Sequence, residues 1–140
     1  MRIGIAVSRY NENITRGLLE GASALLARRG VKLRPKDTVW VPGAFELPAA
    51  VLGLAKSGRY DAILALGCIL KGETSHNHYI AQAVAQGLMR VMLDSGVPVA
   101  FGVLTPDTLA QAKARCGKGT SNKGTECAEA ALEMAALFHG

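Results

Sequence analysis

Strand-like and helix-like apolar patterns alternate four times along this chain, and that alternation restricts the fold more than any other feature. Short runs rich in Val, Ile, Leu and Ala are each followed by a longer segment in which apolar residues recur every three or four positions. The order predicts an α/β fold: a four-stranded parallel sheet flanked by helices on both faces. The expected strands are residues 3–7, 38–41, 62–66 and 98–104, and the expected helices are residues 14–26, 47–56, 78–93, 109–115 and 123–138.

The length and composition fit a single domain spanning residues 1–140. A chain of this length can bury about 70% of its unfolded surface, and 49% apolar against 19% charged residues exclude a disordered chain. Aromatic residues make up only 5%, so the core must be mostly aliphatic. On the last helix we expect the buried stripe to contain Cys127, Ala130, Ala131, Met134 and Phe138.

Cysteine usage and the N-terminus favour a cytoplasmic protein. The cysteines at positions 68, 116 and 127 are odd in number and form no C-x-x-C pair, which disfavours a disulfide framework or a structural zinc site. The first residues run directly into a strand pattern, so we expect no secretory leader. The longest apolar runs are far shorter than the roughly 20 residues of a membrane span, and we expect no membrane partner.

The chain carries a net charge of +5, which raises the question of a polyanionic partner. Its densest basic cluster, residues 28–36, straddles a helix end, where the helix dipole favours cations anyway. Basic and aromatic residues are not interleaved as in nucleic-acid binders. We therefore expect no nucleic acid, and an anionic small molecule instead.

Loops at the carboxyl ends of parallel strands carry the site in such folds, which directs attention to residues 8–13, 42–46, 67–75 and 105–108. The first loop has no glycine, so the dinucleotide fingerprint is absent, and neither a P-loop nor a G-x-S-x-G elbow occurs. His76 and His78 have no third ligand near in sequence, so we expect no metal.

The third loop, Gly-Glu-Thr-Ser-His at positions 72–76, precedes the third long helix. Free N–H groups at a helix N-terminus suit a phosphate, and Lys71 adds positive charge. His76 is a residue type that shuttles protons near neutral pH. The alternative is a helix-capping loop with a surface histidine.

Two further loops offer candidate binding residues. Gly43 allows close backbone approach, and Phe45 with Glu46 can hold a flat, hydroxylated ligand between an apolar wall and a carboxylate. The alternative for these residues is a turn with a glutamate at a helix N-terminus. Tyr10 offers an aromatic face on which a ligand ring can stack. The alternative is that Tyr10 is an aromatic residue packed within its own loop.

Three later residues are ambiguous by themselves. Arg115 ends the short helix beside a glycine-rich loop and can make a bidentate phosphate contact, although a helix C-terminal arginine needs no function. Lys123 opens the last helix, where the dipole disfavours a cation. Phe101 can be explained as core.

Taken together, the motifs resemble the lumazine synthase family over nearly the whole chain. The segments that carry the resemblance are SRYN (8–11), VPGAFELP (41–48), LGCILKGETSHNHYI (66–80), FGVLT (101–105) and RCGKGTSNKGTECAEAALEM (115–134). The resemblance implies a three-layer, flavodoxin-like sandwich and a transferase of riboflavin biosynthesis. Such an enzyme condenses 5-amino-6-(D-ribitylamino)uracil with 3,4-dihydroxy-2-butanone 4-phosphate to 6,7-dimethyl-8-ribityllumazine, releasing phosphate and water, with no cofactor and no metal.

The resemblance also implies roles for individual residues. His76 transfers protons, while Arg115 pairs with the phosphate and Lys123 reaches the pyrimidine. The residues that it implies for substrate binding are Tyr10, Ala44, Phe45, Glu46, Cys68, Ile69, Leu70, Glu73, Thr74 and Phe101. Phe101, Arg115 and Lys123 come from the neighbouring subunit in this family, so a monomer cannot be active.

The family forms homopentamers, some of which pack into icosahedral shells, and riboflavin synthase is a candidate partner.

Two other functions stay open: an archaeal-type riboflavin synthase, which dismutates two lumazines, and a non-catalytic shell protein that binds flavin or lumazine. The chain departs from the family at Tyr10, where Phe or Trp is usual, and at Asn77-His78, where an aromatic and an acidic residue are expected.

Overall fold

The fold is a single four-stranded sheet between two layers of helices. The computed structural model describes residues 1–71, 76–119 and 121–139. All strands are parallel and lie in the order β2-β1-β3-β4. The strands are β1 (Ile3–Ser8), β2 (Thr38–Val41), β3 (Ala62–Cys68) and β4 (Val99–Leu104).

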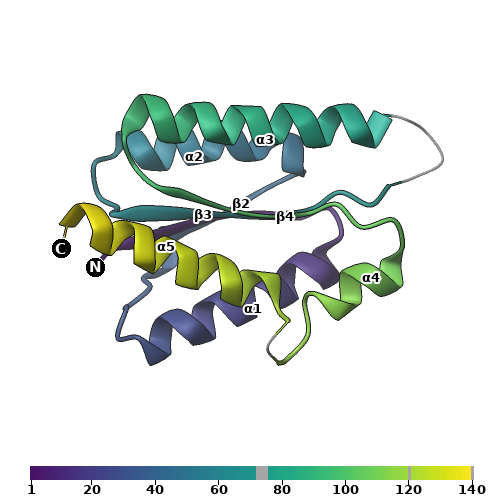
Figure 1. Cartoon of the computed structure of the whole chain (residues 1–140), viewed down its shortest axis with the longest axis horizontal. Coiled ribbons are helices and arrows are strands. Elements are labelled where there is room, and N and C mark those ends of the chain that lie inside the picture. The colour runs from purple at the N-terminus through teal and green to yellow at the C-terminus, as the bar shows by residue number, and fades with distance from the viewer. Residues whose placement is uncertain (72–75, 120, 140) are drawn as a thin grey trace.

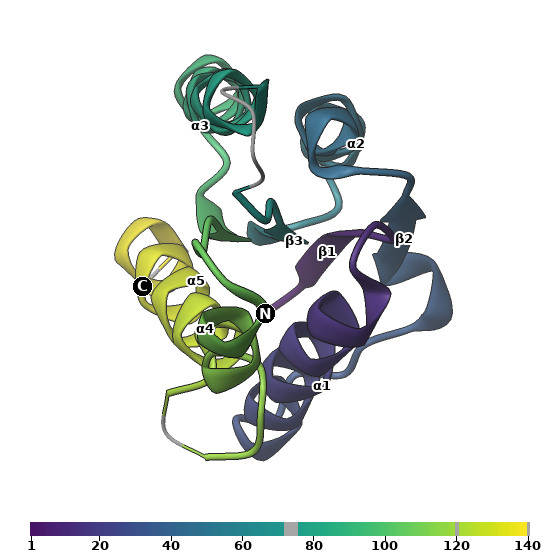
Figure 2. The same ribbon diagram turned by 90° about the vertical axis from the view of Figure 1, so that its right-hand side faces the viewer.

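Helices cover both faces of the sheet, which confirms the three-layer α/β prediction. The helices α2 and α3 pack on one face and α1 and α5 on the other, with α4 beyond the strand ends (Figures 1 and 2). In the part of the chain that the structure describes, no helix is long and apolar enough to cross a membrane. The α-helices are α1 (Glu12–Arg28), α2 (Leu47–Lys56), α3 (His76–Ser95), α4 (Leu109–Ala114) and α5 (Lys123–His139), and the short 3₁₀ turns are η1 (Pro35–Asp37) and η2 (Ala44–Glu46).

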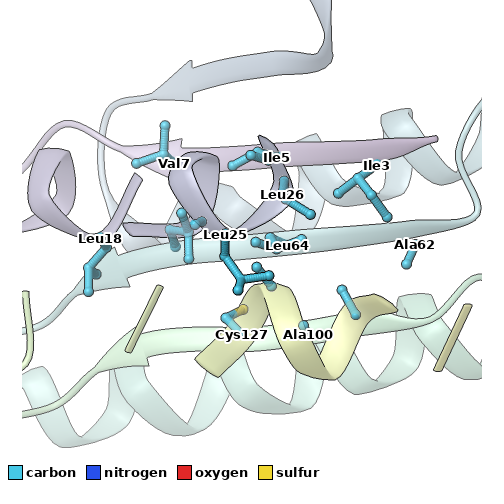
Figure 3. Packing of buried hydrophobic residues seen from close by; sticks show 14 of the residues in the cluster. Ile3, Ile5, Val7, Leu18, Leu25, Leu26, Ala62, Leu64, Ala100 and Cys127 are labelled. Atoms are coloured by element: carbon cyan, nitrogen blue, oxygen red, sulfur yellow. The ribbon is translucent and has the colours of Figure 1, made fainter. Parts of the chain in front are cut away.

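The two cores follow from the alternation of side chains along the strands. On β1, Ile3, Ile5 and Val7 point towards α1 and α5, where they pack with Leu64 and Leu26 (Figure 3). The intervening residues of the sheet face α2 and α3 in a second cluster. Strand β3 is buried along its whole length, as its uninterrupted apolar run predicts.

The predicted buried stripe on α5 is wrong for three residues, since Ala130, Met134 and Phe138 are exposed. Small residues make the contact instead, because α5 lies unusually close to α1. A Cβ atom on Gly124 would lie 1.9 Å from the carbonyl oxygen of Leu18. The residues of α5 that are buried are Gly124, Cys127, Ala128, Ala131 and Ala135.

A buried carboxylate stabilises the amino-terminal side of β2. Asp37, only 3% exposed, accepts hydrogen bonds from the backbone N–H of Arg34 and from the hydroxyl of Tyr60, both at 2.8 Å. The Arg34 guanidinium donates to the same carboxylate. Burial alone would raise the pKa of Asp37, but these donors outweigh it and lower the pKa to about 2.

Candidate active site

The strand order places a crevice at the carboxyl ends of β1 and β3. The chain passes from β1 to β2 on one side and then returns to β3 on the other side, so the loops after β1 and β3 diverge. A cavity of about 380 Å³ lies at this point. It is lined by Tyr10, Asn11, Gly43, Ala44, Phe45, Glu46, Cys68, Ile69, Leu70, Asn77 and Ile80, seven of which the sequence predicted as binding residues.

Tyr10 forms one wall of this cavity. The backbone N–H of Tyr10 donates to the carbonyl of Pro42 (2.9 Å), which ties the loop after β1 to the loop after β2. Its ring lies against Gly43, where a Cβ atom would approach Cδ2 of the ring to 2.6 Å. The side chain is still 65% exposed. Glycine at position 43 therefore allows the Tyr10 ring to pack against the backbone, while an aromatic surface stays available for stacking.

The turn after β2 orients a carboxylate. The N–H of Gly43 donates to Oε1 of Glu46 (2.8 Å), and the N–H of Glu46 donates back to the Gly43 carbonyl (3.1 Å). This pair fixes the Glu46 side chain at the cavity and leaves Oε2 to accept from a ligand hydroxyl. Between them, Ala44 is buried and Phe45 is 62% exposed.

The end of β3 forms an apolar wall. Cys68 and Ile69 are buried, and the N–H of Ile69 donates to the Leu104 carbonyl (2.8 Å), which extends the β3–β4 pairing. Burial raises the pKa of the Cys68 thiol to about 11. The thiol is therefore neutral near pH 7, and it contributes surface rather than a nucleophile.

Two asparagines that were not predicted as binding residues connect these walls. Asn11 adopts a left-handed conformation (φ 63°), and its Nδ2 donates to the Cys68 carbonyl (3.2 Å), linking the first loop to β3. Asn77 donates from Nδ2 to the Leu70 carbonyl, linking α3 to the same strand end. The signal that could have identified Asn11 is its position: an asparagine between a strand and a helix tolerates the left-handed conformation.

His76 begins α3, two residues before the predicted start of that helix. It is exposed and lies outside the cavity lining, next to Asn77, which does line it. No hydrogen bond joins its imidazole to another described residue. Glu73 and Thr74, predicted to offer backbone donors to a phosphate, lie outside the residues that the structure describes.

The other three predicted residues do not reach this cavity within one subunit. Arg115 caps the C-terminus of α4, and its guanidinium pairs with Glu126 on α5. Lys123 is the first residue of α5. Phe101 is 42% exposed on the edge strand β4 and lines a separate hollow of about 320 Å³ beside α3. None of the three is among the described residues that line the cavity.

A larger hollow of about 600 Å³ lies between α1 and α5. Its rim carries both signs of charge, from Arg28 and Lys118 and from Glu126 and Glu129. Its walls are helix sides and the connector before α5, and none of its described lining residues lies in a loop that follows a strand, so the smaller cavity is the stronger candidate. Over the described ranges, no group of three or more His, Cys, Asp or Glu residues is arranged to hold a metal ion.

Comparison with known protein families gives a match over almost the whole chain. A family model described as 6,7-dimethyl-8-ribityllumazine synthase matches residues 1–139. The match therefore includes every strand and helix, together with all of the loops that form the cavity.

Proposed function

Because the chain belongs to the 6,7-dimethyl-8-ribityllumazine synthase family, we propose that it condenses 5-amino-6-(D-ribitylamino)uracil with 3,4-dihydroxy-2-butanone 4-phosphate. The chain is an enzyme, a transferase of riboflavin biosynthesis. The product is 6,7-dimethyl-8-ribityllumazine, and phosphate and water are released. The observation that supports this reaction best is the cavity at the β1–β3 crevice, whose aromatic wall and oriented carboxylate suit a flat ring with a hydroxylated chain.

The pyrimidine substrate occupies this cavity in our proposal. Its ring stacks on Tyr10 and lies against the apolar wall at Cys68 and Ile69. The ribityl chain extends towards Glu46, whose carboxylate accepts hydrogen bonds from the hydroxyl groups. Binding in this orientation directs the 5-amino group of the ring out of the cavity, towards the second substrate.

The ketone phosphate needs an anion site beside the amine. Arg115 of the neighbouring subunit supplies a bidentate cation for the phosphate, and the backbone at Glu73 and Thr74 supplies N–H donors. Lys123 of the same neighbour reaches the pyrimidine. Orientation of the two substrates provides most of the rate enhancement, because an aromatic amine attacks a ketone without an activated enzyme nucleophile.

His76 transfers the protons that the reaction moves. The amine adds to the ketone carbonyl and water leaves, which gives an imine. Phosphate is then eliminated, and the ribitylamino nitrogen closes the second ring with loss of another water. Each step moves a proton between nitrogen, carbon and oxygen, and a histidine near the reacting atoms can carry it. The proposal involves no cofactor and no metal.

The site is completed between subunits of a homo-oligomer. In support, seven predicted residues line the cavity while Phe101, Arg115 and Lys123 lie elsewhere on the same chain. Apolar side chains also remain exposed on three elements that a neighbour would cover: Phe101 on β4, Leu93 on α3 and Phe138 on α5. Sedimentation of the purified protein as a monomer would contradict this part of the proposal.

The decisive experiment mixes the two substrates and follows lumazine absorbance together with phosphate release. We expect both to appear in equal amounts, and neither when one substrate is omitted. Riboflavin formed from lumazine alone would instead indicate a riboflavin synthase. Tight binding of lumazine or flavin without turnover would indicate a storage shell.

A further inference from the structure

We propose that Asn122 is a positioning residue, which sets the location of Arg115 and Lys123 and thereby the geometry of the phosphate side of the site. This inference rests on the proposed function, since it assumes that those two side chains bind substrate. Asn122 lies in the connector between α4 and α5 and is only 4% exposed. It is not among the described residues that line the cavity.

Both polar atoms of the Asn122 side chain are used. Nδ2 donates to the carbonyl of Gly17 on α1 (3.1 Å) and to the carbonyl of Gly117 in the connector (3.0 Å). Oδ1 accepts from the N–H of Thr125 in the first turn of α5 (3.1 Å). One side chain therefore joins three segments: helix α1, the connector after α4, and the start of α5.

Close packing keeps this side chain in place. A Cβ atom on Gly21 would lie 2.4 Å from Oδ1 of Asn122, and one on Gly17 would lie 2.3 Å from the Cys116 carbonyl oxygen. Only glycine lets α1 approach the connector this closely. The amide of Asn122 is consequently held between α1 and α5, where few rotamers fit.

The same connector carries the two functional residues at its ends. The N–H of Lys123 donates to the Arg115 carbonyl (2.8 Å), so the two backbones are joined directly. The N–H of Glu126 donates to the Asn122 carbonyl (3.2 Å), and the Glu126 carboxylate pairs with the Arg115 guanidinium. A shift of Asn122 relative to α1 would therefore move both functional side chains together.

Helix capping alone does not explain the asparagine. The cap requires only an acceptor for the Thr125 N–H, which serine or aspartate supplies equally well. The two bonds from Nδ2 require the two N–H groups of an amide, whereas serine has a single O–H and an ionised aspartate has no donor. The bond to Gly17 is the one that fixes the connector against α1. This difference separates the positioning role from the cap.

The test compares the parent enzyme with Asn122→Ser, which keeps a cap acceptor and removes the amide Nδ2 that donates to Gly17 and Gly117. We expect the KM for the ketone phosphate to rise and kcat/KM to fall roughly 10- to 100-fold, because a displacement of about 1 Å is enough for such a loss. Tyr60→Phe is the matched control: it also removes a buried hydrogen bond, but at the opposite end of the sheet. This control should lower the unfolding midpoint and leave KM unchanged.

A double-mutant cycle supplies a measurement that a purely structural role would not affect. If Asn122 acts through Arg115, then Asn122→Ser in an Arg115→Ala background should change KM for the ketone phosphate less than twofold. An unchanged KM in the single variant, or full additivity in the double variant, would overturn the inference while leaving the condensation activity of the parent intact. A parent without condensation activity would instead overturn the proposed function.

Should Asn122→Ser not fold, the same measurements apply to Asn122→Asp, which keeps the side-chain volume and the cap. If neither variant folds, Asn122 is required for folding itself, and the positioning role is refuted.

Discussion

Active-site complementation tests whether the site is shared between subunits. Tyr10→Ala damages the cavity side of the site, and Arg115→Ala damages the side that we assign to the neighbour. Tyr10 is 65% exposed, so its truncation should cost little stability. Loss of a stacking partner should lower kcat/KM roughly 5- to 150-fold, and loss of the arginine should cost about 1.5–3 kcal/mol of phosphate binding.

The activity expected of a mixed oligomer follows from which site residues line the cavity of one chain and which are assigned to its neighbour. In the proposed shared site, the cavity comes from one chain and the arginine from the next. With random mixing at equal ratio, the cavity comes from an Arg115→Ala chain in half of the sites. The arginine comes from a Tyr10→Ala chain in half of those, so about one quarter of the sites are intact. We therefore expect about a quarter of the parent activity in the unselected mixture. Removal of oligomers that contain a single variant raises this fraction, and the rise is smaller the more subunits the ring has.

The assay uses two differently tagged variants, refolded together and purified through both tags, with lumazine formation measured below the KM of the pyrimidine. Tyr10→Ala mixed with Phe45→Ala serves as the control, because both residues lie on the cavity side and no intact site can form. A co-purified Tyr10→Ala and Arg115→Ala mixture no more active than its parents would refute the shared site.

Three further predictions concern single variants. His76→Ala should lower kcat about 10²- to 10⁴-fold in steady-state assays while leaving residual turnover; complete inactivity of a folded, assembled variant would contradict its role in proton transfer. Arg115→Ala should raise KM for the ketone phosphate more than for the pyrimidine, and equal KM values before and after the change would exclude a phosphate contact. Asp37 has its pKa lowered from 3.8 to about 2 by Arg34 and Tyr60, against the opposing effect of burial. Its stabilisation is therefore complete above about pH 4 and is lost as the pH falls towards 2, a loss of about 2 kcal/mol. Denaturant titrations across this pH range should show that the free energy of unfolding falls less with decreasing pH for Asp37→Asn than for the parent protein. Parallel pH dependences of the two proteins would disprove the linkage.

Local patterns in the sequence were sufficient for the secondary structure and the layers. The apolar run at residues 62–66 predicts a central strand, and β3 is buried on both faces. A short helix was expected at residues 109–115, and α4 spans Leu109–Ala114, where Oγ1 of Thr108 accepts from the Gln111 N–H (3.2 Å) in the first turn. Such features depend on residues close in sequence, so they can be predicted from apolar periodicity and helix-capping preferences.

The loops of the cavity could also be located from the sequence, because parallel strands bring their carboxyl ends to one edge. The hydrogen bonds that link these loops could not be predicted from the sequence. Asn11 bonds to Cys68 and Asn77 bonds to Leu70 across the gaps between walls, and a pairing of this kind depends on the register of the sheet rather than on spacing along the chain.

The sequence by itself determined which segments become strands and helices, and at which edge of the sheet the candidate cavity lies. Only the tertiary structure decided which face of α5 is buried and which predicted residues meet. The apolar periodicity of α5 is compatible with burial of more than one face of that helix. The close approach of α1 determines which face is buried, because Gly124 fits against Leu18 where no larger residue could. For the same reason Arg115 and Lys123 are held by α1 and α5 away from the cavity of their own chain, a separation that depends on contacts between residues about a hundred positions apart.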